Sequence, residues 1–238
     1  IVERFQRSLY TYKKKNGKPL AATSQYSRLS ALKMFFKYLV RQEVILFSPA
    51  TELQLPRLGK PLPKNVMSHE EVQTVLIQCD LSQPYGLRDR AIMELFYSNG
   101  IRRAELSALN IYDIDFEKGN LMIREGKGRK DRIIPIGERA LEWIQRYLDE
   151  ARPKLQKRVD EMTLFLSRTG ERLSDLYLSK HIAEYIQQAN INKKGSCHLF
   201  RHSIATLMLD NGAHHVLVTV SVKRIIPPVI SMLAGDNR

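Results

Sequence analysis

Apolar residues in the first part of the chain recur at the spacing of an amphipathic helix. Four of them within residues 23–43 lie three or four positions apart and predict one buried face: Leu29, Leu32, Phe36 and Leu39. Thr23 or Ser24 is the candidate N-cap of this helix. Four basic residues form its outer face, where they either stay solvated or contact a polyanion: Arg28, Lys33, Lys37 and Arg41.

The periodic pattern stops in residues 56–66. Three prolines and Gly59 break any regular element there, and basic side chains accompany them. This segment is therefore predicted to link a small helical domain, residues 1–55, to a second domain that begins at residue 67.

The second domain is predicted to begin with a capped helix, because Ser68 and Glu71 have the spacing of a capping box. A helical pattern over residues 86–98 ends at Asn99-Gly100, which is a helix stop. Three more helical patterns follow along the chain: residues 137–150, residues 174–190 after Ser174, and residues 198–209.

Between residues 111 and 136 the pattern is that of β-strands. Three short runs rich in β-branched and aromatic residues are separated by turn residues: IYDIDF, LMIRE and RIIPI. They predict a small antiparallel sheet. The expected fold class is therefore mainly α with a small antiparallel β-sheet.

The composition is that of a globular protein with an excess of positive charge. Hydrophobic residues make up 43% of the 238 residues and charged residues 26%, which argues against disorder. Lys and Arg number 38 against 25 Asp and Glu, so the formal net charge of +13 should attract a polyanion. Nucleic acid fits this charge best, although a generically basic soluble or membrane-surface protein would share it.

The cysteines bear on cofactors and location. Cys79 and Cys197 lie far apart and in no CxxC or Cys/His pattern, so we expect free thiols in a reducing cytoplasm, with no disulfide, metal or other cofactor. No apolar stretch approaches the roughly 18 residues that predict a membrane span. The first residues also lack the order of a signal peptide. A cytoplasmic protein without a membrane partner is expected.

Three segments carry side chains suited to phosphodiester chemistry, which needs positive charge at the phosphate oxygens, an acid for the leaving oxygen and a nucleophile. In GIRRAEL, Arg102 follows the predicted helix stop and begins a helix, where backbone N–H groups favour an anion. In GKGRKDR, residues 126–132, Lys127 is at the tip of a predicted β-turn. In HLFRH, His198 and Arg201 are three apart and share one helix face.

In this order and at these intervals, the three motifs resemble the catalytic domain of the tyrosine site-specific recombinases, the phage-type integrase family with its Xer-like members. The resemblance covers about residues 1–213. It implies a helical, SAM-like core-binding domain in residues 1–55, a linker in residues 56–66 and a catalytic domain in residues 67–213, which together clamp duplex DNA. The implied activity is strand exchange through a 3′-phosphotyrosyl intermediate, by a homo- or hetero-oligomer on a specific recombination site.

The resemblance also implies a role for each matched residue. Arg102 and Arg201 correspond to the two arginines that clamp the scissile phosphate, a task that the guanidinium fork suits. Lys127 resembles the hairpin lysine that protonates the departing 5′ hydroxyl, and His198 the residue that assists proton movement at the nucleophile. Glu105 matches the acidic position that supports the site by bonding Arg102 or nearby backbone.

Other residues in the motifs have less specific interpretations. Outside the ordered set, Arg102 would be a surface helix residue and Lys127 an exposed turn lysine. Four more basic residues are either general DNA-phosphate contacts or solvated charges: Arg103, Arg129, Lys130 and Arg132. His202 is expected to be a packed helix histidine, and Tyr177 and Tyr185 are expected to be packing residues.

The family pattern is lost after residue 213. The resemblance requires a Leu-Gly-His or Leu-Gly-Trp element and then a nucleophilic tyrosine, but the last tyrosine is Tyr185 and residues 214–238 contain neither feature. Alternating β-branched residues and Pro227-Pro228 disfavour a helix there. The hypothesis is a frame-shifted or replaced C-terminus; the alternatives are a divergent relative whose partner supplies the tyrosine in trans, or a different nucleophile.

The sequence thus predicts a tyrosine-class site-specific recombinase that binds duplex DNA but in which no nucleophile is found, so that this chain does not cleave DNA alone. The rival interpretation is a non-catalytic DNA-binding regulatory or architectural protein. A third is an RNA-binding protein that uses the same charge.

Overall fold

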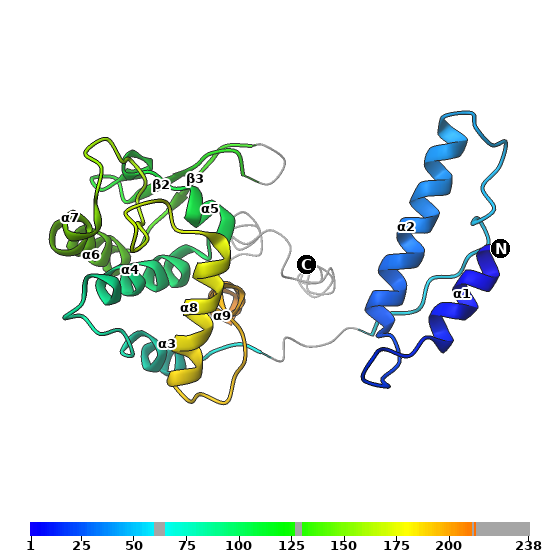
Figure 1. Ribbon diagram of the computed structural model, residues 1–238, viewed down its shortest axis with the longest axis horizontal. Coiled ribbons are helices and arrows are strands. Elements are labelled where there is room, and N and C mark those ends of the chain that lie inside the picture. The colour runs from blue at the N-terminus through cyan, green and yellow to red at the C-terminus, as the bar shows by residue number, and fades with distance from the viewer. Residues whose placement is uncertain (60–64, 127–129, 211, 213–238) are drawn as a thin grey trace, which may run out of the picture. The chain divides into compact units, whose positions relative to one another are not determined.

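The computed structural model describes residues 1–59, 65–126, 130–210 and 212, and it divides into two compact units, Ile1–Leu62 and Pro63–Arg238 (Figure 1). The predicted linker, residues 56–66, spans the division between the units. Each unit has a hydrophobic core of its own.

The N-terminal unit consists of α1 (Val2–Thr11), α2 (Ala22–Arg41) and the segment that follows α2. Its small core is formed by Leu9, Leu20, Leu29, Ala50 and Leu53. The predicted N-cap of α2 is wrong, because α2 begins after Ala21, which is extended and makes no side-chain cap, so that Thr23 and Ser24 lie inside the first turn.

The predicted faces of α2 are confirmed only in part. Leu29 is fully buried and Phe36 packs against the core, whereas Leu32 and Leu39 are half-buried. The interpretation of Lys33 as a solvated charge is wrong, because its ammonium donates hydrogen bonds to the carbonyls of Thr51 (3.2 Å) and Leu53 (2.9 Å). Lys33 therefore ties the segment after α2 back onto the helix.

The C-terminal unit is built around α4 (Pro84–Asn99), which is buried along most of its length (Figure 1). Among the helices that pack against it are α6 (Glu138–Arg146) and α9 (Cys197–Asp210). Two further helices, α3 (His69–Leu76) and α8 (Asp175–Gln188), contact one another. Helical packing around one central helix thus provides most of the core.

Three helix ends that the sequence predicts in this unit are confirmed, at Ser68, Ser174 and Gly100. Ser68 and Glu71 form a capping box at α3, and the Ser174 hydroxyl accepts a hydrogen bond from the Tyr177 backbone at the start of α8. Gly100 ends α4 in the left-handed conformation, with φ of 59°, where a residue without a Cβ meets no steric cost.

The predicted small antiparallel sheet is also confirmed. Its strands are β1 (Ile114–Asp115), β2 (Asn120–Ile123) and β3 (Arg132–Pro135), in the order β1-β2-β3. The one-turn 3-10 helix η1 (Ile111–Asp113) precedes β1. In the register, Leu121 pairs with Ile134, and Ile123 pairs with Arg132, the first residue of β3. The fold class is mainly α with one small sheet, as predicted.

The helix predicted over residues 137–150 continues further. A π-helical turn, η2 (Tyr147–Ala151), joins α6 to α7 (Arg152–Leu155). The fully buried Tyr147 donates to the carbonyl of Leu164 and accepts from the amide of Leu166, both at 3.1 Å. The apolar run Leu164–Leu166 is thereby fixed against the core.

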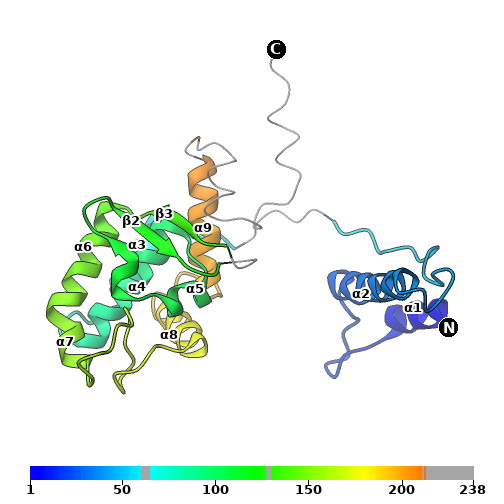
Figure 2. The ribbon, with the colours of Figure 1, turned by 90° about the horizontal axis from the view of Figure 1, so that it is seen from above.

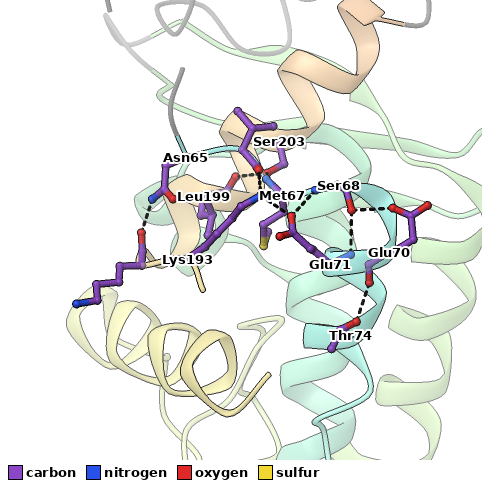
Figure 3. A network of polar contacts seen from close by, with 11 residues as sticks. Asn65, Met67, Ser68, Glu70, Glu71, Thr74, Lys193, Leu199 and Ser203 are labelled. Atoms are coloured by element: carbon purple, nitrogen blue, oxygen red, sulfur yellow. Dashed lines mark hydrogen bonds and ion pairs between the residues drawn. The ribbon is translucent and has the colours of Figure 1, made fainter. Parts of the chain in front are cut away.

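The first described residues of the C-terminal unit are tied to α9 (Figure 3). The amide of buried Met67 donates to the Ser203 hydroxyl at 2.8 Å, and that hydroxyl donates to the carbonyl of Leu199 at 2.8 Å. Lys193, in the loop before α9, donates to the carbonyl of Val66 and to the Glu71 carboxylate. We call these contacts the α3–α9 clasp.

In the described part of the chain, we find no helix with both the length and the apolar character required to cross a membrane.

Candidate functional site

The turn between α4 and the short helix α5 (Arg103–Ala108) positions Arg102. The left-handed Gly100 ends α4, and the Asn99 side chain accepts a hydrogen bond from the amide of Ile101 at 3.1 Å. Arg102 is then the N-cap of α5, as predicted, and its side chain is 27% exposed. Its guanidinium is therefore within reach of a ligand at the surface.

Glu105 binds Arg102 in the way the sequence predicts. Its carboxylate accepts a hydrogen bond from the Arg102 amide at 3.1 Å and from the Arg102 guanidinium at 2.7 Å. The Glu105 side chain is only 8% exposed, so losing these hydrogen bonds would leave a buried carboxylate with too few donors, which costs free energy. These two hydrogen bonds tie Arg102 to α5.

The same carboxylate binds a second arginine. Arg132 donates to both Glu105 oxygens, at 3.0 Å and 2.7 Å. Burial alone raises the pKa of Glu105, but the hydrogen bonds from Arg132 and Arg102 outweigh burial and bring this pKa to about 2. The interpretation of Arg132 as a solvated charge is therefore wrong, because its guanidinium is ion-paired; a direct contact between Arg132 and DNA stays a prediction.

Arg201 reaches the same place from α9. It is 4% exposed and its guanidinium donates to the carbonyl of Gly100, two residues before Arg102. Burial, followed by repulsion from Arg102, lowers the pKa of Arg201 to about 10, whereas Glu105 acts in the opposite direction. Both ribbon views place α5 beside α9, next to the ends of β2 and β3 (Figures 1 and 2). Segments about a hundred residues apart in sequence thus share one electrostatic environment.

The two histidines of the third motif have different surroundings on α9. His198 is exposed, whereas His202 is half-buried, as predicted for a packed helix histidine. Burial lowers the pKa of His202, and neighbouring His198 and Arg201 lower it further. His198 therefore lies at the surface on the same helix as Arg201.

The β2–β3 hairpin begins against this cluster. Lys127 and Arg129 lie outside the described residues, but Gly126 is described. A Cβ on Gly126 would lie 2.4 Å from the Arg132 guanidinium and 3.6 Å from the Glu105 carboxylate. A side chain at this position would have to displace the Arg132 guanidinium, and the base of the hairpin lies close to Glu105. Lys130, on the other side of the tip, is exposed.

Arg103 and the tyrosines of α8 lie away from the cluster. Arg103 donates to the Ser179 hydroxyl at 2.5 Å and pairs with Asp175 at 3.4 Å, so its side chain is engaged with α8. Tyr185 donates to the Asp89 carboxylate at 3.0 Å, and burial raises its pKa. Tyr185 is therefore a packing residue, as predicted, and is poorly suited to attack phosphorus.

The donor groups at the site are suited to an anion and not to a metal. The Glu105 carboxylate is paired with both Arg102 and Arg132, and Arg201 is close enough to Arg102 and Glu105 for both to affect its pKa. Within the residues that the structure describes, no group of three or more His, Cys, Asp or Glu side chains is arranged to hold a metal ion. The arrangement can bind and polarise a phosphate.

Comparison with known proteins identifies the family of the chain. The model of the phage integrase family matches residues 65–220, and the chain belongs to this family. It is similar to tyrosine recombinase XerC 2 of Ralstonia nicotianae, with 47% identity over 213 residues, 90% of this chain and 61% of that protein. It is also similar to tyrosine recombinase XerD of Pseudomonas putida, with 37% identity over 78% of this chain and 61% of that protein.

Solved structures show the same fold. The crystal structure of the XerA recombinase matches with a TM-score of 0.62 and 26% identity, covering 99% of this chain and 78% of that one. The XerH site-specific recombinase, bound to a palindromic difH substrate in a post-cleavage complex, matches with a TM-score of 0.72 and 24% identity over 94% of this chain and 66% of that one. The chain spans about three fifths of the length of the first two curated relatives, 61% and 58%.

Sequence reasoning missed the ion pair of Arg132 and the contacts of Ser203 and Lys193. Arg132 lies within a recognised motif, but its partner Glu105 lies 27 positions earlier, before the sheet. Ser203 directly follows the HLFRH motif and looks like an ordinary helix serine. No local pattern indicates either set of contacts.

Proposed function

We propose that this chain binds duplex DNA and prepares a backbone phosphate for strand exchange as part of a site-specific recombinase of the tyrosine class. One observation carries the proposal: Arg201 donates to the carbonyl of Gly100, beside Arg102, so two guanidinium groups from distant segments lie close together. Like charges are brought together at a cost that an anionic ligand removes. Membership of the phage integrase family supports DNA as that anion.

In the proposed reaction Arg102 and Arg201 bind the non-bridging oxygens of the scissile phosphate and stabilise the charge that develops in the transition state. A tyrosine supplied by a partner or by a restored C-terminal segment attacks phosphorus through its oxygen and forms a 3′-phosphotyrosyl bond, while the bond to the 5′ oxygen breaks. Lys127 gives a proton to that leaving oxygen, and His198 assists proton movement at the nucleophile. Glu105 holds Arg102 in place.

The two units have separate roles in this proposal. Residues 1–55 form the core-binding domain and residues 67–213 the catalytic domain, which together grip the duplex; the protein acts in the cytoplasm, as a homo- or hetero-oligomer on its recombination site. Arg103, Arg129 and Lys130 contact phosphates outside the scissile position. Crystal structures of the XerH recombinase bound to a difH substrate support duplex DNA as the partner.

The test uses a nicked suicide duplex, which traps the covalent intermediate. The sequence has no tyrosine after Tyr185, so the 238-residue chain should shift duplex DNA in a gel without forming a covalent adduct. A chimera that replaces residues 214–238 with the matching C-terminal segment of the Ralstonia relative should form the adduct. An adduct formed by the 238-residue chain itself would refute its inability to cleave.

Arg201→Ala in the chimera separates a recombinase from a DNA-binding regulator. We expect adduct formation to fall by at least about 100-fold, as for the loss of one transition-state donor, while DNA affinity falls much less. Arg139→Ala, which removes a charge from a different ion pair on α6, is the matched control and should retain cleavage. A regulator would show a change in affinity only.

A further inference from the structure

Arg132 is held in the site by the strongest geometry that its side chain can make. Its guanidinium donates two hydrogen bonds, one to each oxygen of Glu105, and its side chain is 20% exposed. Such paired N–H donors match both the charge and the plane of a carboxylate. Arg132 and Arg102 are thus bonded to the same Glu105 carboxylate.

The charges around Glu105 explain why a second arginine is needed. Without Arg132, the Glu105 carboxylate at 2.7 Å would neutralise Arg102. It would also place a negative charge beside the phosphate. Because Arg132 shares this carboxylate, the described cluster of Arg102, Arg132, Arg201 and Glu105 keeps two positive charges in excess. A phosphate that approaches Arg102 then meets a net attraction.

Packing shows that Arg132 also supports the hairpin. A Cβ on Gly126 would lie only 2.4 Å from the Arg132 guanidinium and 3.0 Å from the carbonyl of Lys130. The guanidinium therefore fills the space below the base of the hairpin. Any shift of Arg132 would change the contacts of both Glu105 and Gly126.

We propose that Arg132 is a positioning residue, which neutralises Glu105 and thereby leaves Arg102 able to bind a DNA phosphate. It acts through the carboxylate, in place of the direct DNA-phosphate contact that its motif suggests. This inference rests on the proposed function, because the ligand of Arg102 is taken to be a DNA phosphate.

The first test is a double-mutant cycle in the full chain, with duplex DNA affinity measured across a salt series. Arg132→Gln should weaken binding about tenfold, within the range for coupled neighbours, because Glu105 is left against Arg102. In the background of Glu105→Gln the same change should have almost no effect. An equal loss in both backgrounds would show a direct phosphate contact and would overturn the proposal.

Two further variants complete the cycle. Arg132→Lys keeps the charge but cannot present two parallel N–H groups, so its affinity should lie between those of the parent and Arg132→Gln. Arg139→Gln removes the same charge from an arginine paired with Glu94, and should change affinity little in either background. A loss with Arg139→Gln as large as that with Arg132→Gln would mean that only the net charge matters.

The second test does not depend on DNA. The Glu105 carboxyl is titrated by carbon-13 NMR in the parent and in Arg132→Gln. Its pKa, about 2 in the parent, should rise in the variant because the largest stabilising hydrogen bonds are lost. An unchanged pKa of Glu105 would overturn the role of Arg132. Failure of the parent chain to bind duplex DNA would instead refute the proposed function, and the titration would then still test whether Arg132 neutralises Glu105.

Discussion

Arg88, in the described part of the C-terminal unit, is a charged side chain with no exposed surface. It lies between the rings of Tyr85 and Tyr177, 5.6 Å and 5.5 Å from their centroids, and donates to the carbonyl of Leu166 at 2.8 Å. Asp89 balances its charge, with a hydrogen bond of 2.8 Å. Such a pair costs much desolvation, so either partner alone is strongly destabilising.

Asp89→Ala should therefore lower the free energy of unfolding by about 3–5 kcal/mol, because Arg88 and the Tyr185 hydroxyl both lose their acceptor. Denaturant unfolding measures the change. Asp160→Ala is the control: it removes an ion pair with Arg158 in which both side chains are about 70% exposed, so the free energy of unfolding should change far less than in Asp89→Ala. Equal losses in the two variants would contradict this account.

Single residues of the site were predictable where a motif fixes them. The contact of Arg102 with Glu105 follows from the local geometry of one helix start. The place of Arg201 beside them depends on the packing of α9 and was suggested only by the order of the motifs. The partner of Arg132 was not predictable, because the contact with Glu105 depends on how the sheet folds back onto α5. The charge and the position of Arg132 in the sequence predict only a basic residue near a turn, without a partner.

At the scale of elements, capping residues made the C-terminal unit predictable. Ser68, Ser174 and Gly100 fix helix ends by local hydrogen bonds and backbone conformation. The sequence pattern did not predict that α6 continues through the π-helical turn η2. Tyr147 lies in that turn and bonds the backbone of Leu164 and Leu166, and such tertiary contacts leave no local signal. Tertiary contacts override the local pattern there.

The α3–α9 clasp supports the helix that carries Arg201. Ser203→Ala should lower the free energy of unfolding by about 1–3 kcal/mol, because the buried amide of Met67 loses its acceptor. Hydrogen exchange at that amide should also become faster. Both measurements are made on the full chain, as denaturant unfolding and as amide exchange by NMR.

Thr206→Val provides the control for the clasp. Thr206 lies on the same helix, and its hydroxyl donates to the carbonyl of His202 at 3.1 Å, four residues earlier. Loss of the Thr206 hydroxyl leaves the Met67 amide bonded to Ser203, so hydrogen exchange at the Met67 amide should stay slow. Fast exchange in both variants would mean that general loosening of α9, and not the Ser203 contact, is responsible.

At the scale of the whole molecule, the positive charge is unevenly divided. Residues 1–62 contain 12 Lys and Arg against 3 Asp and Glu, a net of +9, whereas residues 63–238 contain 26 against 22, a net of +4. The C-terminal unit also uses several arginines in internal ion pairs with Asp89, Glu94 and Glu105. The N-terminal unit therefore supplies most of the charge available to a polyanion.

This division predicts where the salt dependence of DNA binding originates. Lys13, Lys14 and Lys15 are exposed, and each lysine that contacts a phosphate contributes about 0.9 to the slope of log affinity against log salt. Replacing all three by glutamine should reduce this slope and weaken binding most at low salt.

The control replaces Lys154, Lys157 and Arg158, which are also exposed and lie in α7 or just after it. Both ribbon views place α7 away from α9 (Figures 1 and 2). Equal slopes for the two triple variants would mean that net charge alone attracts the duplex, without a DNA-binding face on the N-terminal unit.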